Sequence, residues 1–181
     1  MAQVCIYTLE PLDHGGVMAK VRVAAELQKQ FGHSVNLLFT ATEQVPTGSR
    51  WEIIRYFVRR VWPYWAKHGE YSGLAVPHWP LPIWMTYLLP WAIGRSAFVD
   101  RDIHLVVSGA NQCGIPAALA RKRYVVWIGT LYADELRGKA LTGDRWSLRM
   151  LAGLNGFMLR WQERIVFERA SMILTNGDHT A

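Results

Sequence analysis

Residues 4–40 decide the fold class, and they read VCIYTLEPLDHGGVMAKVRVAAELQKQFGHSVNLLFT. The apolar run 4–9 has the length of a buried strand, and a turn-rich loop follows it. From Val17 the apolar residues recur at helical spacing, and Gly32 supplies a left-handed residue that ends the helix. A second apolar run covers residues 34–40. Strand, glycine loop, helix and strand in this order predict a right-handed, parallel βαβ unit.

One side of the expected first helix is apolar, and we expect that side to pack on the sheet. Its members are Val17, Val21, Ala24, Leu27 and Phe31.

The last third of the chain repeats the alternation of strands and helices. Strands are expected at residues 103–107, 124–128 and 172–175. A loop and a short helix over residues 115–121 separate the first two, with Pro116 in the first turn. Such alternation predicts an α/β fold, a Rossmann-like parallel sheet flanked by helices, in a single domain over residues 1–181.

A long helix is expected over residues 145–170. Its apolar stripe consists of Met150, Leu154, Phe157, Trp161 and Ile165.

Residues 50–100 form a Trp- and Pro-rich insertion in this pattern. Ser49 and Glu52 have the spacing of a capping box, which predicts a helix over residues 50–67. Residues 71–94 contain no Asp, Glu, Lys or Arg, but four prolines argue against a membrane-spanning helix there.

The composition excludes several classes of protein. The net charge is +6, yet no zinc-finger spacing or RNA-binding aromatic motif is present, so we expect no nucleic-acid partner. The two cysteines, Cys5 and Cys113, provide neither a metal site nor a disulfide framework. The first ten residues lack the pattern of a cleaved signal peptide. We therefore expect a cytoplasmic protein without metal or cofactor.

The turn His14-Gly15-Gly16 is the first candidate for chemistry. Glycine lets a ligand approach the backbone, and a helix N-terminus attracts phosphate groups. This turn is not the dinucleotide-binding glycine fingerprint, and the alternative is a tight turn that merely requires glycine. A dinucleotide-binding oxidoreductase is also disfavoured because no acidic residue ends the second strand.

Both ends of the chain resemble family-four retaining glycosyltransferases of the GT-B type. The opening EPLDHGGV at residues 10–17 and the run FGHSV at residues 31–35 are similar to that family's first strand, Gly-Gly loop, helix and Gly-His-x-Val. The segment ERASMILTNG at residues 168–177 resembles the helix and strand late in the family's first domain.

The resemblance implies that the chain is the N-terminal, acceptor-side half of an enzyme that moves a sugar from a nucleoside-diphosphate sugar to a hydroxyl acceptor, either lipid-linked or a glycan. Gly15 and Gly16 would lie against the donor diphosphate and the acceptor, with His14 beside them. The donor-binding C-terminal domain is expected to be absent from these residues, so the chain alone is expected to be inactive.

Further candidates follow the later strands. Asn111 is expected to bind acceptor hydroxyls, Thr130 to hydrogen-bond a sugar hydroxyl, and Asp134 and Glu135 to act as catalytic or orienting acids. The alternative for Asn111 is a turning loop. For Asp134 and Glu135 it is the start of a helix, where acids favour the dipole.

A rival interpretation is a non-catalytic α/β module that binds a membrane or a protein partner. The expected helix over residues 50–67 combines Trp with Arg, as helices in a bilayer interface do. Trp79, Trp84, Trp91 and Tyr87 follow it. These residues predict either peripheral attachment to the anionic inner face of the membrane, if they are exposed, or ordinary core, if they are buried.

Overall fold

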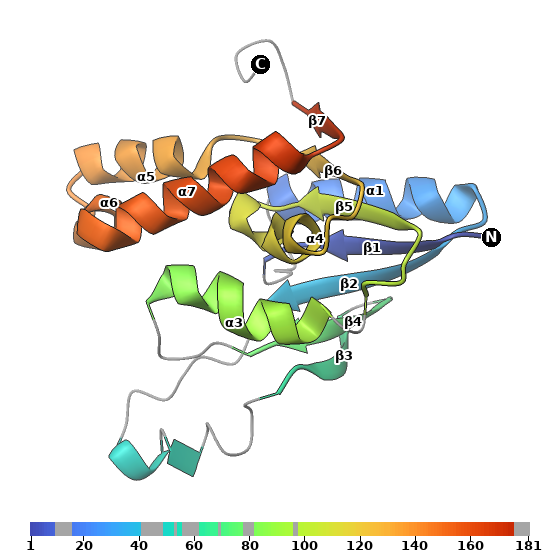
Figure 1. The fold of residues 1–181 in the computed structure, drawn as a ribbon, viewed down its shortest axis with the longest axis horizontal. Coiled ribbons are helices and arrows are strands. Elements are labelled where there is room, and N and C mark those ends of the chain that lie inside the picture. The colour runs from blue at the N-terminus through green and yellow to red at the C-terminus, as the bar shows by residue number, and fades with distance from the viewer. Residues whose placement is uncertain are drawn as a thin grey trace.

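The chain forms an α/β fold with a mostly parallel, Rossmann-like sheet flanked by helices (Figure 1). The computed structural model describes residues 1–9, 16–40, 49–52, 54–55, 62–68, 70–77, 82–95 and 98–175. Seven strands have the order β3-β4-β2-β1-β5-β6-β7, and only β3 runs antiparallel to its neighbour. The predicted fold class is confirmed.

The first βαβ unit is the centre of this sheet. It consists of β1 (Gln3–Tyr7), α1 (Gly16–Gln30) and β2 (Ser34–Thr40), and β1 pairs in parallel with β2. Gly32 ends α1 with a φ of 76°, and the N–H of His33 donates to the carbonyl of Gln28 at 3.0 Å. The predicted unit and its helix stop are therefore confirmed.

The predicted apolar face of α1 is partly wrong. Leu27 and Phe31 are exposed, whereas Met18 and Ala25 are buried beside Val21 and Ala24. Leu27 instead lines an apolar groove of about 110 Å³, together with residues of β5, β6 and β7. Periodicity alone does not show how far a sheet extends beneath a helix.

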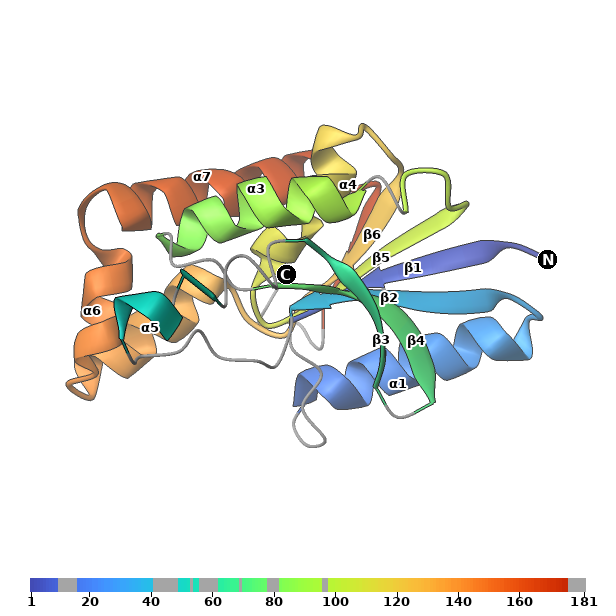
Figure 2. The ribbon, with the colours of Figure 1, turned by 90° about the horizontal axis from the view of Figure 1, so that it is seen from below.

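Helices cover the two faces of the sheet unequally, as Figure 2 shows. α1 lies on one face, and its core includes Val21, Ile6 and Leu37. On the other face lie α3 (Ile83–Arg95), α4 (Ile115–Leu119) and α7 (Gly153–Arg169), with Tyr7, Trp91 and Val166 in their core. The elements that complete the second half of the chain are β5 (Ile103–Val107), a 3-10 turn (Asn111–Gly114), β6 (Tyr124–Trp127), α5 (Tyr132–Leu141), α6 (Arg145–Leu151) and β7 (Met172–Leu174).

The Trp- and Pro-rich stretch supplies part of the sheet. The helix predicted over residues 50–67 is wrong at its end, because Tyr64–His68 is the strand β3, which forms a hairpin with β4 (Tyr71–Val76). Residues 50–52 and 54–55 are helical. Cross-strand pairing in the hairpin overrides the helical spacing of the aromatic residues.

The exposure of the aromatic residues divides this stretch in two. Tyr87 and Trp91 on α3 are buried in the core, so membrane contact by these two side chains is excluded. Trp51, Trp62 and Trp65 are exposed. Trp79 lies outside the described residues.

The single helix predicted over residues 145–170 is instead two helices. Asp144 caps α6, since its carboxylate accepts from the N–H groups of Trp146 and Ser147 at 3.2 and 3.1 Å. The hydrogen bonds from Ser147 also lower the pKa of this carboxyl. Gly153 then adopts a φ of 52°, which separates α6 from α7.

Candidate functional site

The sheet has a topological switch point between β1 and β5. The chain leaves β1 through α1 on one face towards β2, and it leaves β5 through α4 on the other face towards β6. The helices that follow β1 and β5 therefore lie on opposite faces of the sheet. Ligands of open α/β sheets bind at this kind of position.

The loop after β5 lies next to the first turn of α1. A Cβ atom at Gly109 would lie 3.5 Å from Cγ2 of Val17, which is an ordinary van der Waals contact. Ser108 holds the loop, because its hydroxyl accepts from the N–H of Ala110 at 3.1 Å and donates to Sγ of Cys113. Two candidate segments from distant parts of the sequence thus lie side by side.

Gly16 begins α1 at this switch point. A Cβ atom added to Gly16 would meet no atom within 4 Å among the described residues, and no acidic residue lies in the first turn of α1. The positive end of this 15-residue helix is therefore not neutralised by its own first turn. His14 and Gly15 lie outside the described residues.

Asn111 is placed beneath the surface rather than on it. The side chain is fully buried, and its Nδ2 donates to Oε1 of Glu163 at 2.9 Å. Its Oδ1 has no partner among the described residues. In this position Asn111 connects the loop after β5 to α7, and it would need to be uncovered to contact an acceptor.

Glu163 is a residue that the sequence analysis missed. It is buried on α7, and the same Oε1 accepts a second hydrogen bond, from the N–H of Tyr132 at 3.0 Å. Leu131, the residue before α5, provides no side-chain cap, so the carboxylate of Glu163 replaces one at the N-terminus of α5. One carboxylate therefore holds together the loop after β5, α5 and α7.

Thr130, Asp134 and Glu135 follow β6 at the same edge of the sheet. Thr130 is exposed. Asp134 and Glu135 lie in the first turn of α5 and form ion pairs with Arg137 at 2.7 Å and Lys139 at 2.5 Å. These pairs are solvent-exposed and local to the helix, which agrees with the alternative that the two acids begin a helix.

A small cavity adjoins the Glu163 network. It has a volume of about 10 Å³ and is lined by Gln112, Tyr132, Leu159 and Glu163, among others. Ligand pockets usually hold roughly 300 Å³ or more, so this cavity does not admit a sugar. The surface at the switch point is the better candidate for a ligand site.

Comparison with known proteins does not identify a family for this chain. No family model, no curated protein and no solved structure matches it. Within the described part of the chain, no three His, Cys, Asp or Glu side chains are grouped as metal ligands would be. The described helices include none with both the length and the apolar character needed to cross a bilayer.

A buried His–Tyr pair lies between the strands that border the switch point. The hydroxyl of Tyr7 lies 2.9 Å from Nδ1 of His104, and both side chains are buried. Burial lowers the pKa of His104, while a hydrogen bond involving the backbone of Arg101 acts in the opposite direction. Burial therefore favours the neutral form of His104 in the folded protein.

This pair predicts a loss of stability in acid. Because the folded-state pKa of His104 lies below the unfolded value of about 6.5, the unfolded chain binds the proton first, and the free energy of unfolding falls as the pH drops below about 6.5. His104→Gln is expected to reduce this slope, measured by urea unfolding between about pH 7 and 5. Equal slopes in both proteins would show that His104 does not contribute.

Proposed function

We propose that this chain is the acceptor-side half of a nucleotide-sugar-dependent, retaining glycosyltransferase of the GT-B type. The observation that carries the proposal is that the first turn of α1 lies next to the loop after β5 at the switch point. The resemblance of residues 10–17 and 168–177 to family-four enzymes supports the same function.

The proposed chemistry is positioning and charge stabilisation. The free N–H groups of the first turn of α1 would bind the departing diphosphate, on which negative charge develops during transfer. The exposed hydroxyl of Thr130 would hydrogen-bond a sugar or acceptor hydroxyl. Asp134 and Glu135 would orient that hydroxyl after leaving their exposed ion pairs, which contribute little energy.

A second candidate function is a non-catalytic α/β module that binds a membrane or a protein partner. The exposed side chains of Trp51, Trp62 and Trp65 favour it, because exposed aromatic groups are typical of binding surfaces. The two candidates differ in whether the switch point binds anything.

Binding measurements on the isolated chain distinguish the two candidate functions. We expect calorimetry with UDP- and GDP-sugars to detect no micromolar binding, because the main donor pocket belongs to the other half of a GT-B enzyme. Inorganic pyrophosphate at millimolar concentration is expected to shift the amide NMR signals of Gly16–Met18 and of residues 108–111, since these groups surround the proposed diphosphate position.

The control is the basic run Arg121-Lys122-Arg123, which lies before β6 and away from the switch point. If only the amide NMR signals of this run shifted, pyrophosphate would be binding to positive charge in general rather than to the switch point. That outcome, or micromolar binding of a nucleotide sugar, would contradict the proposal.

A further inference from the structure

The outer side of α7 is apolar, although the helix lies at the surface. Leu154, Phe157 and Trp161 are 64%, 59% and 43% exposed. With the half-buried Ile165 they are spaced three or four residues apart, so they form one continuous stripe, here called the α7 outer stripe. Three members of the apolar stripe that the sequence predicts, Leu154, Phe157 and Trp161, are therefore exposed.

The inner side of α7 explains this orientation. Gln162 and Glu163 point inwards, where Nε2 of Gln162 donates to the carbonyl of Trp84 at 2.8 Å and Glu163 accepts from Asn111 and Tyr132. These polar contacts, together with buried Leu159 and Val166, fix which side of the helix meets the core. Leu154, Phe157 and Trp161 are therefore left exposed, whereas Ile165 at the end of the stripe packs partly against the core.

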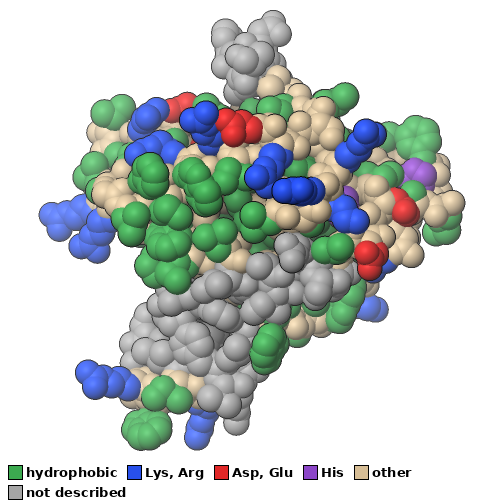
Figure 3. All heavy atoms as spheres, in the orientation of Figure 1, with side chains coloured by type: hydrophobic (Ala, Val, Ile, Leu, Met, Phe, Trp, Pro, Cys, Tyr) green, Lys and Arg blue, Asp and Glu red, His purple; other side chains and the backbone are tan. Residues whose placement is uncertain are grey.

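The stripe is part of a larger apolar area. Figure 3 shows hydrophobic side chains gathered over α7 and α3, with Lys and Arg side chains at the outer end and along the upper edge. On α6, Trp146 and Leu148 are also exposed. Large apolar patches rimmed by polar groups mark sites that bind a partner or a membrane.

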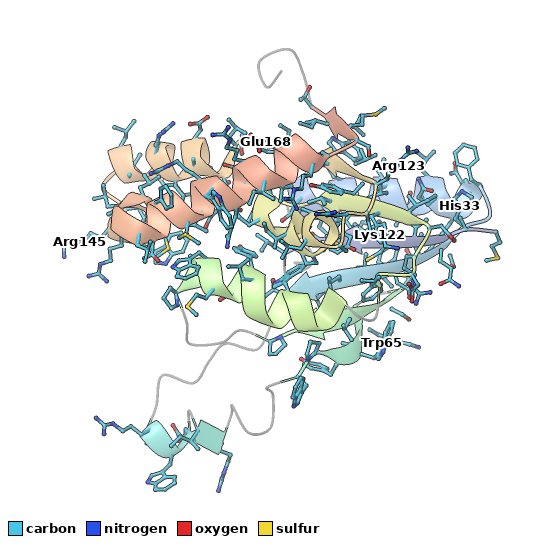
Figure 4. The ribbon with its side chains drawn as sticks, viewed as in Figure 1. His33, Trp65, Lys122, Arg123, Arg145 and Glu168 are labelled. Atoms are coloured by element: carbon cyan, nitrogen blue, oxygen red, sulfur yellow. The ribbon has the colours of Figure 1, made fainter. Side chains whose placement is uncertain are left out.

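The charge around the stripe selects the partner. Residues 145–169 contain five arginines and two glutamates, a net charge of +3, and one of these glutamates, Glu163, is buried. The exposed Glu168 is already paired with Arg164 at 2.6 Å. Arg145, Arg149 and Arg160 are exposed, and Arg145 points away from the end of α6 in Figure 4.

We propose that the α7 outer stripe and the arginines beside it dock this protein on an anionic lipid bilayer. Trp and Phe favour the boundary between lipid headgroups and acyl chains, and arginine keeps its guanidinium at the phosphates while its stem covers apolar surface. A helix with an apolar aromatic side and basic flanks lies in the plane of such an interface.

A second copy of the chain fits this surface less well. Pairing the stripe about a two-fold axis would bring the arginines of both copies to one interface, where Glu168, the exposed acid of α7, is already paired with Arg164. An anionic lipid surface provides the opposite charge over the whole patch. The docking inference is independent of sugar transfer, because lipid binding is measured without a donor or acceptor.

The test is flotation of the purified chain with vesicles of phosphatidylcholine alone and with added phosphatidylglycerol, at low and at high salt. We expect flotation with the anionic vesicles only, and its loss at high salt. Phe157→Ser is expected to weaken vesicle binding by about tenfold or more, and Arg160→Gln by about fivefold.

Two matched variants control for general effects. Phe31→Ser removes a more exposed phenylalanine, 70% accessible at the end of α1, and Arg123→Gln removes an exposed arginine at the opposite end of the molecule from Arg145 (Figure 4). Both are expected to bind vesicles like the original chain.

Three results would overturn the proposal. They are an absence of flotation with anionic vesicles, flotation that Phe157→Ser and Arg160→Gln do not weaken relative to the controls, and a dimer in sedimentation velocity that Phe157→Ser dissociates. The third would assign the stripe to an interface between copies.

Discussion

Replacing Gly16 by valine is expected to lower sugar transfer by about a hundredfold, because displacing a reacting group by about 1 Å has an effect of this size. The new side chain would occupy the open space in front of the first turn of α1, where we place the diphosphate. The fold is expected to remain intact, since the added Cβ meets no described atom within 4 Å. Transfer rates and circular dichroism of a protein that combines this chain with the proposed donor-binding half measure both effects.

Gly138→Val is the matched control. Gly138 lies within α5, and a Cβ atom there also meets no described atom within 4 Å. We expect this variant to transfer sugar at the original rate. If Gly16→Val transfers equally well, the first turn of α1 does not contact the donor or acceptor.

Removing the carboxylate of Glu163 is expected to lower the free energy of unfolding by about 3 kcal/mol, because two buried donors each lose an acceptor at about 1–3 kcal/mol apiece. These donors are Nδ2 of Asn111 and the N–H of Tyr132. Urea unfolding of Glu163→Ala measures the loss, and melting should shift by about 10 °C for a chain of this length.

Two further variants test whether the lost hydrogen bonds cause the loss of stability. Glu163→Gln keeps an acceptor oxygen at the same position and is expected to lose less than half as much stability. Glu168→Ala on the same helix removes an exposed carboxylate that pairs with Arg164, and it is expected to change the free energy of unfolding by less than about 0.5 kcal/mol. A loss in Glu163→Ala no larger than in Glu168→Ala would show that the buried network does not hold the three segments together.

The sequence predicted the strands β1, β2, β5, β6 and β7 well, because each is a short apolar run between turn residues. β2 and β5 have the predicted bounds, and β1, β6 and β7 differ from them by one or two residues. The hairpin of β3 and β4 was missed, since its pairing is a tertiary interaction that the aromatic spacing does not reveal.

The sequence did not predict which side of α7 is buried. Periodicity identified the stripe that includes Phe157 and Trp161, but its burial depends on where Glu163 finds hydrogen-bond donors. Those donors come from Asn111 and Tyr132, which are distant in the sequence. The sequence also did not show that Asn111, which we expected to bind acceptor hydroxyls, lies in this buried network.

Sugar transfer by a protein that combines this chain with the proposed donor-binding half is the most direct test of the proposed function. Release of nucleoside diphosphate from UDP- and GDP-sugars, with mass spectrometry of the acceptor, reports the reaction. We predict that release requires a hydroxyl acceptor, that the product retains the configuration of the donor sugar, and that Gly16→Val suppresses both release and product. Acceptor-dependent transfer at the same rate in Gly16→Val would contradict the proposed site. No transfer from any of these donors by a correctly folded protein would contradict the proposed function.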